Sequence, residues 1–381
     1  MMGAILILGM GEELWMRFVP KYLELLGAGV WIVAFYGTLK DFLDAVYQYP
    51  GGWLADRLGR RRSLMLFTLL AVLGYVLYLA ANNWQMIIAG TVFVMAWSSL
   101  TLPATFAVIG DNLASDRRAI GFGMNSILKR IPIVIAPFFG GWLMLRFGLA
   151  TGFKAGLVIT IVLAAFSFLF LRFYREDSRA HVPTHFLEVW HSLSPDLKRL
   201  LVADCLARWA EGIPKVFVVL YAMNVLRVNS FEFGWLTSLQ QLAAIFIYIP
   251  IAKLSDQMNR RPFILLTFSF FALFPLALVK ASTMFWIVIA FLISGMREIG
   301  EPARKAMIVD LAPEAVRGRT VGVYYFIRGM VVFPASLIGG WLWSIDRTLP
   351  FYAAFVVGVI GCLFYGLISR GNSGRRETLH P

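Results

Sequence analysis

The chain has 381 residues, of which 59% are hydrophobic and 15% are charged. A soluble domain cannot bury that much apolar surface, so the composition excludes a soluble protein and predicts a polytopic membrane protein. The net charge of +13 does not indicate a nucleic-acid partner, because the basic residues are concentrated in particular loops.

Twelve apolar segments, each long enough to cross a bilayer, predict an all-α membrane protein with twelve transmembrane helices. About nineteen Lys and Arg residues follow even-numbered segments or lie in the tail, against about five in the opposite loops, so both termini are expected to be cytoplasmic. The segments lie near residues 3–26, 30–55, 63–81, 85–110, 119–146, 152–172, 199–226, 232–252, 262–280, 284–309, 318–343 and 350–369. The expected domains are an N-terminal six-helix bundle (1–172), a cytoplasmic linker (173–198), a C-terminal six-helix bundle (199–369) and a cytoplasmic tail (370–381).

The first two segments carry ionisable residues inside the apolar run. A charge at mid-membrane costs on the order of 3 kcal/mol unless it faces water or a partner. Glu13 and Arg17 are four residues apart and can neutralise each other on one helix face. The same spacing relates Lys40 and Asp44, whereas Glu12 has no partner one turn away. These side chains are therefore expected to converge on a polar interior.

A short basic turn follows the second segment, with the sequence GGWLADRLGRRR over residues 51–62. Its glycines let two helix ends approach closely, and its arginines hold the turn in the cytoplasm. The spacing resembles the loop between helices 2 and 3 of major facilitator superfamily transporters. The resemblance implies two six-helix bundles that rock around a midplane site, with this turn as a latch on the cytoplasmic side. The predicted gating residues of this turn are Gly52, Asp56, Arg57, Gly59, Arg60 and Arg61.

The fifth segment contains the sequence APFFGG over residues 136–141. It resembles the end of the glycine-proline motif of proton antiporters, although Ala136 replaces the expected glycine. Proline and glycine also permit kinks and close contacts in any transmembrane helix, so packing explains the match equally well. The resemblance favours export by proton antiport.

The seventh and tenth segments repeat the pattern of charges within an apolar run. Asp204 lies four residues before Arg208, and Arg297 lies four residues before Glu301. Such spacing favours ion pairs on one helix face, and these pairs alone could serve to insert and brace a polar helix. In the family these helices line the central cavity, so the resemblance implies that their charges face the substrate.

A second copy of the basic turn has the sequence PIAKLSDQMNRR over residues 250–261. Asp256, Arg260 and Arg261 match the first copy and are predicted gating residues. A nearly constant offset relates further positions of the two halves, such as Pro103 with Pro302, Asp111 with Asp310, and Lys129 with Arg328. Two homologous halves predict two pseudo-symmetric six-helix bundles, which is the major facilitator fold.

Basic residues outnumber acids within the segments by roughly eleven to eight, and a surplus of positive charge suits an anionic or zwitterionic substrate. Acids beside arginines are candidates for proton coupling, because a carboxylate that loses its arginine during transport takes up a proton. The predicted substrate-binding residues are Arg17, Lys40, Lys129, Arg130, Arg208, Arg297 and Arg328. The predicted proton-coupling residues are Glu13, Asp44, Glu211, Glu298 and Glu301.

These patterns predict a secondary active transporter that moves a small anionic, zwitterionic or amphipathic organic molecule by alternating access, with proton-coupled efflux as the leading hypothesis. An uptake or exchange carrier for organic anions or phosphate esters and a lipid transporter are alternatives. A membrane sensor that transports nothing is an alternative of a different class. Substrate-dependent proton flux would separate a transporter from a sensor.

The expected partners are a small-molecule substrate, protons and the lipid bilayer. The sequence shows no nucleophile–base set, P-loop or metal-binding pattern, so we expect no enzymatic activity, no cofactor and no metal ion. We expect a monomer that binds no nucleic acid and resides in the cytoplasmic (inner) membrane of a bacterium.

Overall fold

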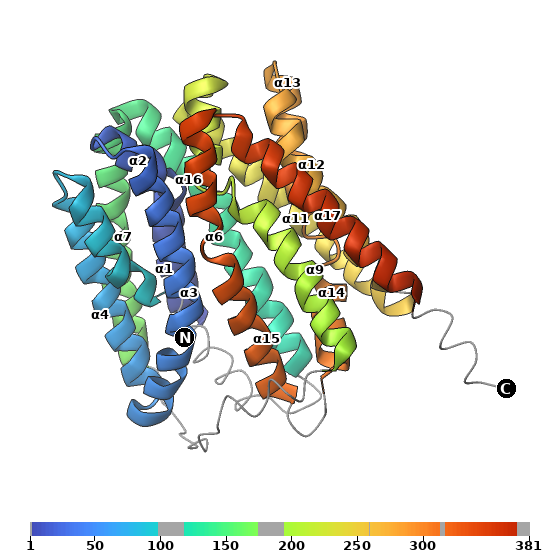
Figure 1. Cartoon of the computed structure of the whole chain (residues 1–381). Coiled ribbons are helices and arrows are strands. Elements are labelled where there is room, and N and C mark those ends of the chain that lie inside the picture. Colours follow the sequence, from blue (N-terminus) through green and yellow to red (C-terminus); the bar gives the residue numbers. More distant parts are fainter. Residues whose placement is uncertain (1, 98–117, 174–193, 259, 313–316, 372–381) are drawn as a thin grey trace. The chain divides into compact units, whose positions relative to one another are not determined.

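The computed structural model describes residues 2–97, 118–173, 194–258, 260–312 and 317–371 (Figure 1). All regular secondary structure in these ranges is helical, which confirms the predicted all-α fold. The surroundings of some residues within these helices are not described, among them Gly52, Asp56, Arg60, Lys129 and Asp256.

Two compact units make up the chain. Unit 1 comprises Met1–Pro183 together with Phe217–Ser238, and unit 2 comprises Thr184–Val216 together with Leu239–Pro381. The segment 217–238 therefore packs with the N-terminal helices, although it follows the first helix of unit 2 in the sequence.

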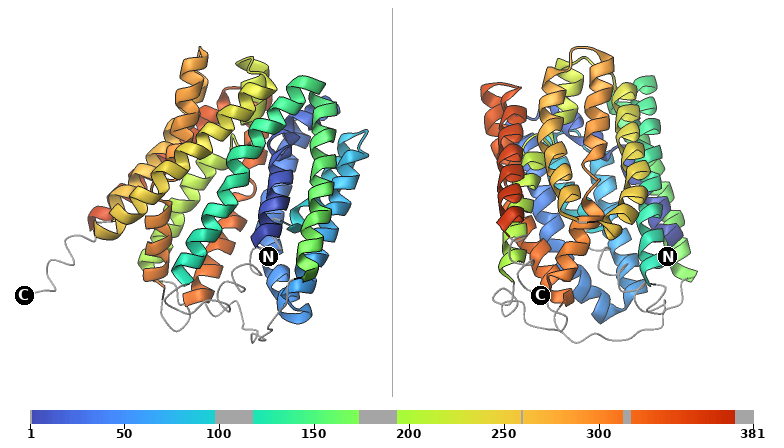
Figure 2. Two further views of the ribbon diagram at one scale, coloured as in Figure 1. Left: turned by 180° about the vertical axis from the view of Figure 1, so that it is seen from behind. Right: turned by 90° about the vertical axis from the view of Figure 1, so that its right-hand side faces the viewer.

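In unit 1, helix α7 lies beside both α1 and α4 (Figures 1 and 2). The elements of this unit are α1 (Met2–Glu13), η1 (Met16–Phe18), α2 (Val19–Leu25), α3 (Val30–Leu58), α4 (Arg60–Leu79), a helix over Trp84–Trp97, α6 (Arg118–Phe147), α7 (Leu149–Phe173), α10 (Phe217–Leu220), η2 (Tyr221–Val225) and the start of α11 (Ser230–Gln257).

The core of unit 1 is aromatic and is centred on Trp15, which has no exposed surface. The rings of Tyr75, Tyr78 and Phe153 meet its indole edge-on, with centroids 5.5 to 5.8 Å away. The indole Nε1 donates a hydrogen bond of 2.9 Å to the Thr160 hydroxyl, so its one polar group is satisfied.

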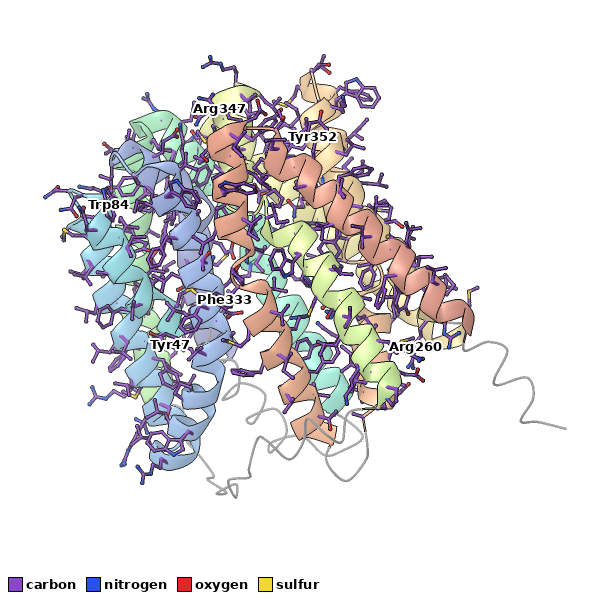
Figure 3. The ribbon with its side chains drawn as sticks, viewed as in Figure 1. Tyr47, Trp84, Arg260, Phe333, Arg347 and Tyr352 are labelled. Carbon is purple, nitrogen blue, oxygen red and sulfur yellow. The ribbon has the colours of Figure 1, made fainter. Side chains whose placement is uncertain are left out.

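In unit 2, helix α17 packs along α12 and α9 (Figure 1). Arg260 and Arg347 mark opposite ends of this unit in Figure 3. The elements of unit 2 are α9 (Pro195–Gly212), most of α11, α12 (Arg260–Lys280), α13 (Met284–Met296), α14 (Glu301–Asp310), α15 (Arg317–Val332), α16 (Ala335–Ile345) and α17 (Leu349–Gly371).

Four of the predicted spans that carry internal charges are interrupted helices, whereas α3 and α6, which also carry charges, are continuous. In the described part of the chain, helices end at Glu13, Gly212, Met296 and Val332, each inside a predicted span. Proline has no backbone N–H and ends a helix that precedes it. Pro214 and Pro334 each lie two residues after such an end, whereas Pro20 and Pro302 lie in the first turn of the next α-helix, α2 and α14. Such interruptions leave backbone and charged groups that must be satisfied inside the protein.

Six helices in the described ranges are long and apolar enough to cross a membrane: Arg61–Leu79, Arg130–Phe147, Leu149–Arg172, Arg260–Lys280, Thr320–Ile345 and Leu349–Leu367. Two shorter apolar helices cover Trp84–Trp97 and Met284–Met296. The predicted number of twelve spans stays a prediction, because part of the fourth span lies outside the described residues.

Helices α6 and α11 cross closely at two glycines within unit 1. A Cβ atom on Gly234 would lie 2.3 Å from the carbonyl oxygen of Pro137, and one on Gly141 would lie 2.4 Å from that of Ser230. Only a residue without a side chain fits at these distances, as is common where transmembrane helices approach.

Replacing Gly234 with alanine is therefore expected to destabilise the protein by about 1–3 kcal/mol, because the added methyl group overlaps a backbone carbonyl that cannot rotate away. Thermal unfolding of purified protein measures this loss. The matched control is Gly322→Ala, since a Cβ atom at Gly322 meets nothing within 4 Å. Equal melting temperatures for the two variants would contradict the close crossing.

Candidate functional site

Charged side chains from three interrupted spans of unit 2 meet in one group, which we name the arginine network. Its members lie on α9, directly after α13, on α14 and on α15. They are Asp204, Arg208, Glu211, Arg297, Glu301, Arg304, Tyr324 and Arg328.

Asp204 lies at the centre of the network and is only 1% exposed. Its Oδ2 atom accepts hydrogen bonds from the Nη1 atom of Arg304, from the Tyr324 hydroxyl at 3.1 Å and from the Nη1 atom of Arg328 at 3.2 Å. Arg304 is equally buried. A charge at such depth is tolerated only with partners, and Asp204 has three donors.

Glu301 is the second anchor of Arg304. The Nη2 atom of Arg304 lies 2.7 Å from both carboxylate oxygens of Glu301, and Arg208 donates to the same carboxylate at 3.3 Å. One guanidinium thus bridges two acids on different helices. Arginine suits this role because its planar guanidinium group holds several N–H donors in a fixed geometry.

Local sequence explains how Arg304 reaches both acids. Gly300 precedes α14, and its amide donates a hydrogen bond of 2.5 Å to the Thr267 hydroxyl. Helix α14 then starts at Glu301, so Arg304 lies one turn later on the same face. The break in the tenth span therefore turns this face toward α9.

Glu211 links the remaining two arginines. Arg208 Nη1 lies 2.8 Å from Glu211 Oε2, and Arg297 Nη1 lies 3.6 Å from Glu211 Oε1. Both guanidinium groups also lie over the ring of Phe271, at 5.1 and 5.2 Å from its centroid. Aromatic faces stabilise cations that have lost part of their hydration.

Two arginines of the network keep donors that are not used. Arg328 lies over the ring of Tyr325 at 4.6 Å, and its guanidinium contacts one carboxylate, which Arg304 shares. The buried Nε atom of Arg208 has no hydrogen-bond partner in the described structure and lies 3.9 Å from Asp204 Oδ1. Within the network, four guanidinium groups face three carboxylates, which leaves one positive charge in excess.

In unit 1 the predicted charged residues form smaller groups. Arg17 Nε donates to Glu13 Oε2 at 3.1 Å, as the four-residue spacing predicted. Lys40 and Arg130 are half-buried on α3 and α6, and Asp44 is exposed on α3.

Glu298 and Lys129 are predicted site residues that none of the contacts above includes. Glu298, of unit 2, is half-buried after the end of α13. The side chain of Lys129 lies outside the described residues, so its predicted position opposite Arg328 stays a prediction.

The first basic turn lies where the sequence placed it, between α3 and α4 at Gly59. The φ angle of Gly59 is +82°, a conformation that favours glycine. The Arg57 guanidinium lies 4.7 Å from the centre of the exposed Trp53 ring, and Arg61 is half-buried. The side chains of Asp56 and Arg60 and the surroundings of Gly52 lie outside the described structure, so the latch stays a prediction.

In the second turn Arg260 pairs with Asp310 at the end of α14, and Arg261 is half-buried. Arg260 is labelled in Figure 3. The side chain of Asp256 is not described.

The network contains five of the predicted site residues: Arg208, Glu211, Arg297, Glu301 and Arg328. Sequence reasoning missed Arg304, it considered Tyr324 only as an aromatic residue that could stack on a substrate, and it considered Asp204 only as a helix neighbour of Arg208. One available signal was the three-residue spacing from Glu301 to Arg304, next to a proline that starts a helix.

Comparison with known proteins identifies relatives along the whole chain. The family model described as Major Facilitator Superfamily matches residues 1–209 and 200–380. The multidrug resistance protein MdtH of Photorhabdus laumondii is 24% identical, over 94% of this chain and 90% of the relative. An MFS-type transporter of Methanocaldococcus jannaschii is 21% identical, over 93% of this chain and 90% of the relative. Among solved structures, a POT family transporter in complex with 5-aminolevulinic acid has a TM-score of 0.75 at 14% identity, covering 96% of this chain and 95% of the other.

Proposed function

The chain belongs to the major facilitator superfamily and is an integral multi-pass membrane transporter, and on this premise we propose that it exports a small zwitterionic molecule in exchange for protons. The arginine network of unit 2 is the proposed substrate site. The observation that carries the proposal is the excess positive charge of this network together with its unused guanidinium donors.

A substrate carboxylate is the group that these donors fit. Arg328 is about one-fifth exposed, is held flat against Tyr325, and shares its single carboxylate partner with Arg304. An incoming carboxylate can accept hydrogen bonds from the Arg328 N–H groups that do not bind Asp204. The buried ion pair of Asp204 with Arg304 then stays intact. The unpaired Nε–H of Arg208 supplies a further donor at the same network.

A substrate ammonium group is the counterpart that the acids of the network fit. Glu211 and Glu301 are partly exposed, at 29% and 12% of their side chains, whereas Asp204 is closed off at 1%. A molecule with both charges can therefore meet arginine at one end and glutamate at the other. The structural neighbour solved with 5-aminolevulinic acid, an acid that also bears an amino group, supports this substrate class.

Competition for a carboxylate supplies the coupling to protons. A substrate ammonium group and a proton are alternative partners of Glu211 or Glu301, so binding of one lowers the affinity for the other by the same factor. Loading of substrate from the cytoplasm then releases a proton, and its release outside lets a proton bind in return. The names of the multidrug resistance relatives and the APFFGG motif support the outward direction.

A second candidate is an uptake or exchange carrier for organic anions, which the excess positive charge favours. An anion that displaces Asp204 or Glu301 from an arginine would promote protonation of that acid, so anion and proton would move together. The direction of proton movement separates the two candidates: protons move with the anion in this one and opposite to the substrate in the zwitterion exporter.

The proposal is tested by thermal unfolding of the purified protein against a panel of zwitterions, anions, cations and neutral molecules, with 5-aminolevulinic acid and its methyl ester as the first matched pair. A ligand of the folded form raises the melting temperature by mass action. We expect the stabilising compounds to carry a free carboxylate and an amine, and esterification to abolish the effect. A set of stabilisers that holds only cations and neutral molecules would contradict the proposal.

A further inference from the structure

Glu12 is a buried acid of unit 1 that the proposed substrate site does not use. It lies in the last turn of α1, one residue before the Glu13–Arg17 pair, and is only 5% exposed. A carboxyl group at such depth has exchanged nearly all of its water for protein partners.

The hydrogen-bond partner of the Glu12 carboxyl group is a neutral phenol. The Tyr75 hydroxyl of α4 donates to Glu12 Oε1 at 2.5 Å. The Tyr75 ring in turn packs edge-on against Trp15, within the aromatic core of the unit. In the described structure no cation lies within ion-pair distance of the Glu12 carboxyl group, in contrast to Glu13, which contacts Arg17 at 3.1 Å.

Charged groups on the surrounding helices act on Glu12 only through space. Glu13 on its own helix repels a negative charge there, and Lys40 of α3 attracts one. On α4 the neighbouring titratable group is the Tyr75 phenol itself. Helices α6 and α7 also pack against α1, and their described charged residues include Arg130 and Lys154, neither of which is an ion-pair partner of Glu12.

This environment favours the uncharged form of the acid. Burying an ionised carboxylate without an ion pair is costly, and one phenol donor replaces only part of the lost hydration. The neutral acid avoids that cost and still accepts the hydrogen bond from Tyr75. Asp204 of unit 2 shows the opposite solution, since that carboxylate is equally buried but is held by two arginines.

We propose that Glu12 is a protonated carboxylic acid in this conformation and carries a proton in the exchange, in addition to the competition between substrate and proton at Glu211 and Glu301. The second half of this statement rests on the proposed function, whereas the first half does not. The proton leaves when a conformational change admits water or brings Lys40 closer, because either event stabilises the carboxylate. The carboxyl group then binds a proton again when the aromatic core closes around it.

Infrared spectroscopy of the full-length protein in lipid nanodiscs at neutral pH tests the protonation. A protonated carboxyl group has a C=O stretching band that a carboxylate lacks. We expect this band in the wild type and its loss in Glu12→Gln, whose amide keeps the volume and can accept from Tyr75. We also expect Tyr75→Phe to keep the band at a shifted frequency, because a hydrogen bond to the carbonyl is removed.

Glu13→Gln is the matched control, because Glu13 is ion-paired and should contribute no such band. Identical wild-type and Glu12→Gln spectra in this region would overturn the protonation of Glu12. The protonation of Glu12 would also be overturned if the band were lost in Glu13→Gln but kept in Glu12→Gln.

Proteoliposomes test the coupling role. We expect Glu12→Gln to show reduced substrate-driven proton movement, while a zwitterion that stabilises the wild type still raises the melting temperature of the variant. Undiminished proton movement in Glu12→Gln would overturn this role. If no zwitterion binds the wild type, the proposed function fails, and the infrared spectra still decide the state of Glu12.

Discussion

Replacing Arg304 with methionine is expected to destabilise the protein by about 3–5 kcal/mol, the usual cost of removing one partner from a buried ion pair. Asp204 and Glu301 both lose their closest guanidinium, and Asp204, which is only 1% exposed, cannot recover hydration at its depth in unit 2. A sharp fall in melting temperature, or failure to recover folded protein from the membrane, is the expected result.

A double variant keeps this prediction testable even if the single variant does not fold. Removing both charges in Asp204→Asn with Arg304→Met should restore much of the lost stability, because no uncompensated charge is then left at Asp204. Lys305→Met is the matched control, since Lys305 contacts the same Glu301 carboxylate but is 53% exposed. A single Arg304 variant as stable as the Lys305 variant would contradict the buried network.

Replacing Arg328 with glutamine is expected to weaken substrate binding by about 10–100-fold, which is the loss of one charge-assisted hydrogen bond. Folding should be affected less than by the Arg304 variant, since Asp204 keeps Arg304 and Tyr324. Arg328→Lys should recover only part of the affinity, because an ammonium group cannot offer two parallel donors to a carboxylate. Transport of a stabilising zwitterion at several concentrations separates weaker binding from slower turnover.

Arg347→Gln is the control for this series. Arg347 is exposed in the turn between α16 and α17, far from Arg260 at the other end of unit 2 (Figure 3). Its removal also lowers the net charge by one and should leave affinity unchanged. Equal losses in both variants would show that net charge, rather than the network, determines binding.

The helical fold was predictable because an apolar run of bilayer length has one stable solution, a helix with its backbone groups paired internally. The interruptions were less predictable. The sequence indicated continuous spans through Pro214 and Pro302, but a helix ends before each of these prolines and a new one starts at or near it. Proline is also tolerated inside long helices, as Pro132 and Pro137 are in α6, so its presence alone does not locate a break.

The ion pairs of the candidate site were also only partly predictable from the sequence. The charges on the seventh, tenth and eleventh spans were predicted to converge, and within unit 2 they meet in the arginine network. Their pairing was derived from four-residue spacing on unbroken helices, and contacts between helices decide it instead. Arg208 lies closer to Glu211, three residues away, than to Asp204. Asp204 is held by Arg304 and Arg328 from other helices, which no local spacing could indicate.

Proton movement in proteoliposomes tests the central claim most directly. Vesicles with equal pH on both sides and a pH-sensitive dye inside receive a zwitterion that stabilises the purified protein, added outside. Exchange predicts that the lumen becomes more alkaline as substrate enters and protons leave, and that Arg328→Gln abolishes the change at low substrate concentration. Acidification of the lumen, or substrate entry without proton movement, would contradict proton exchange.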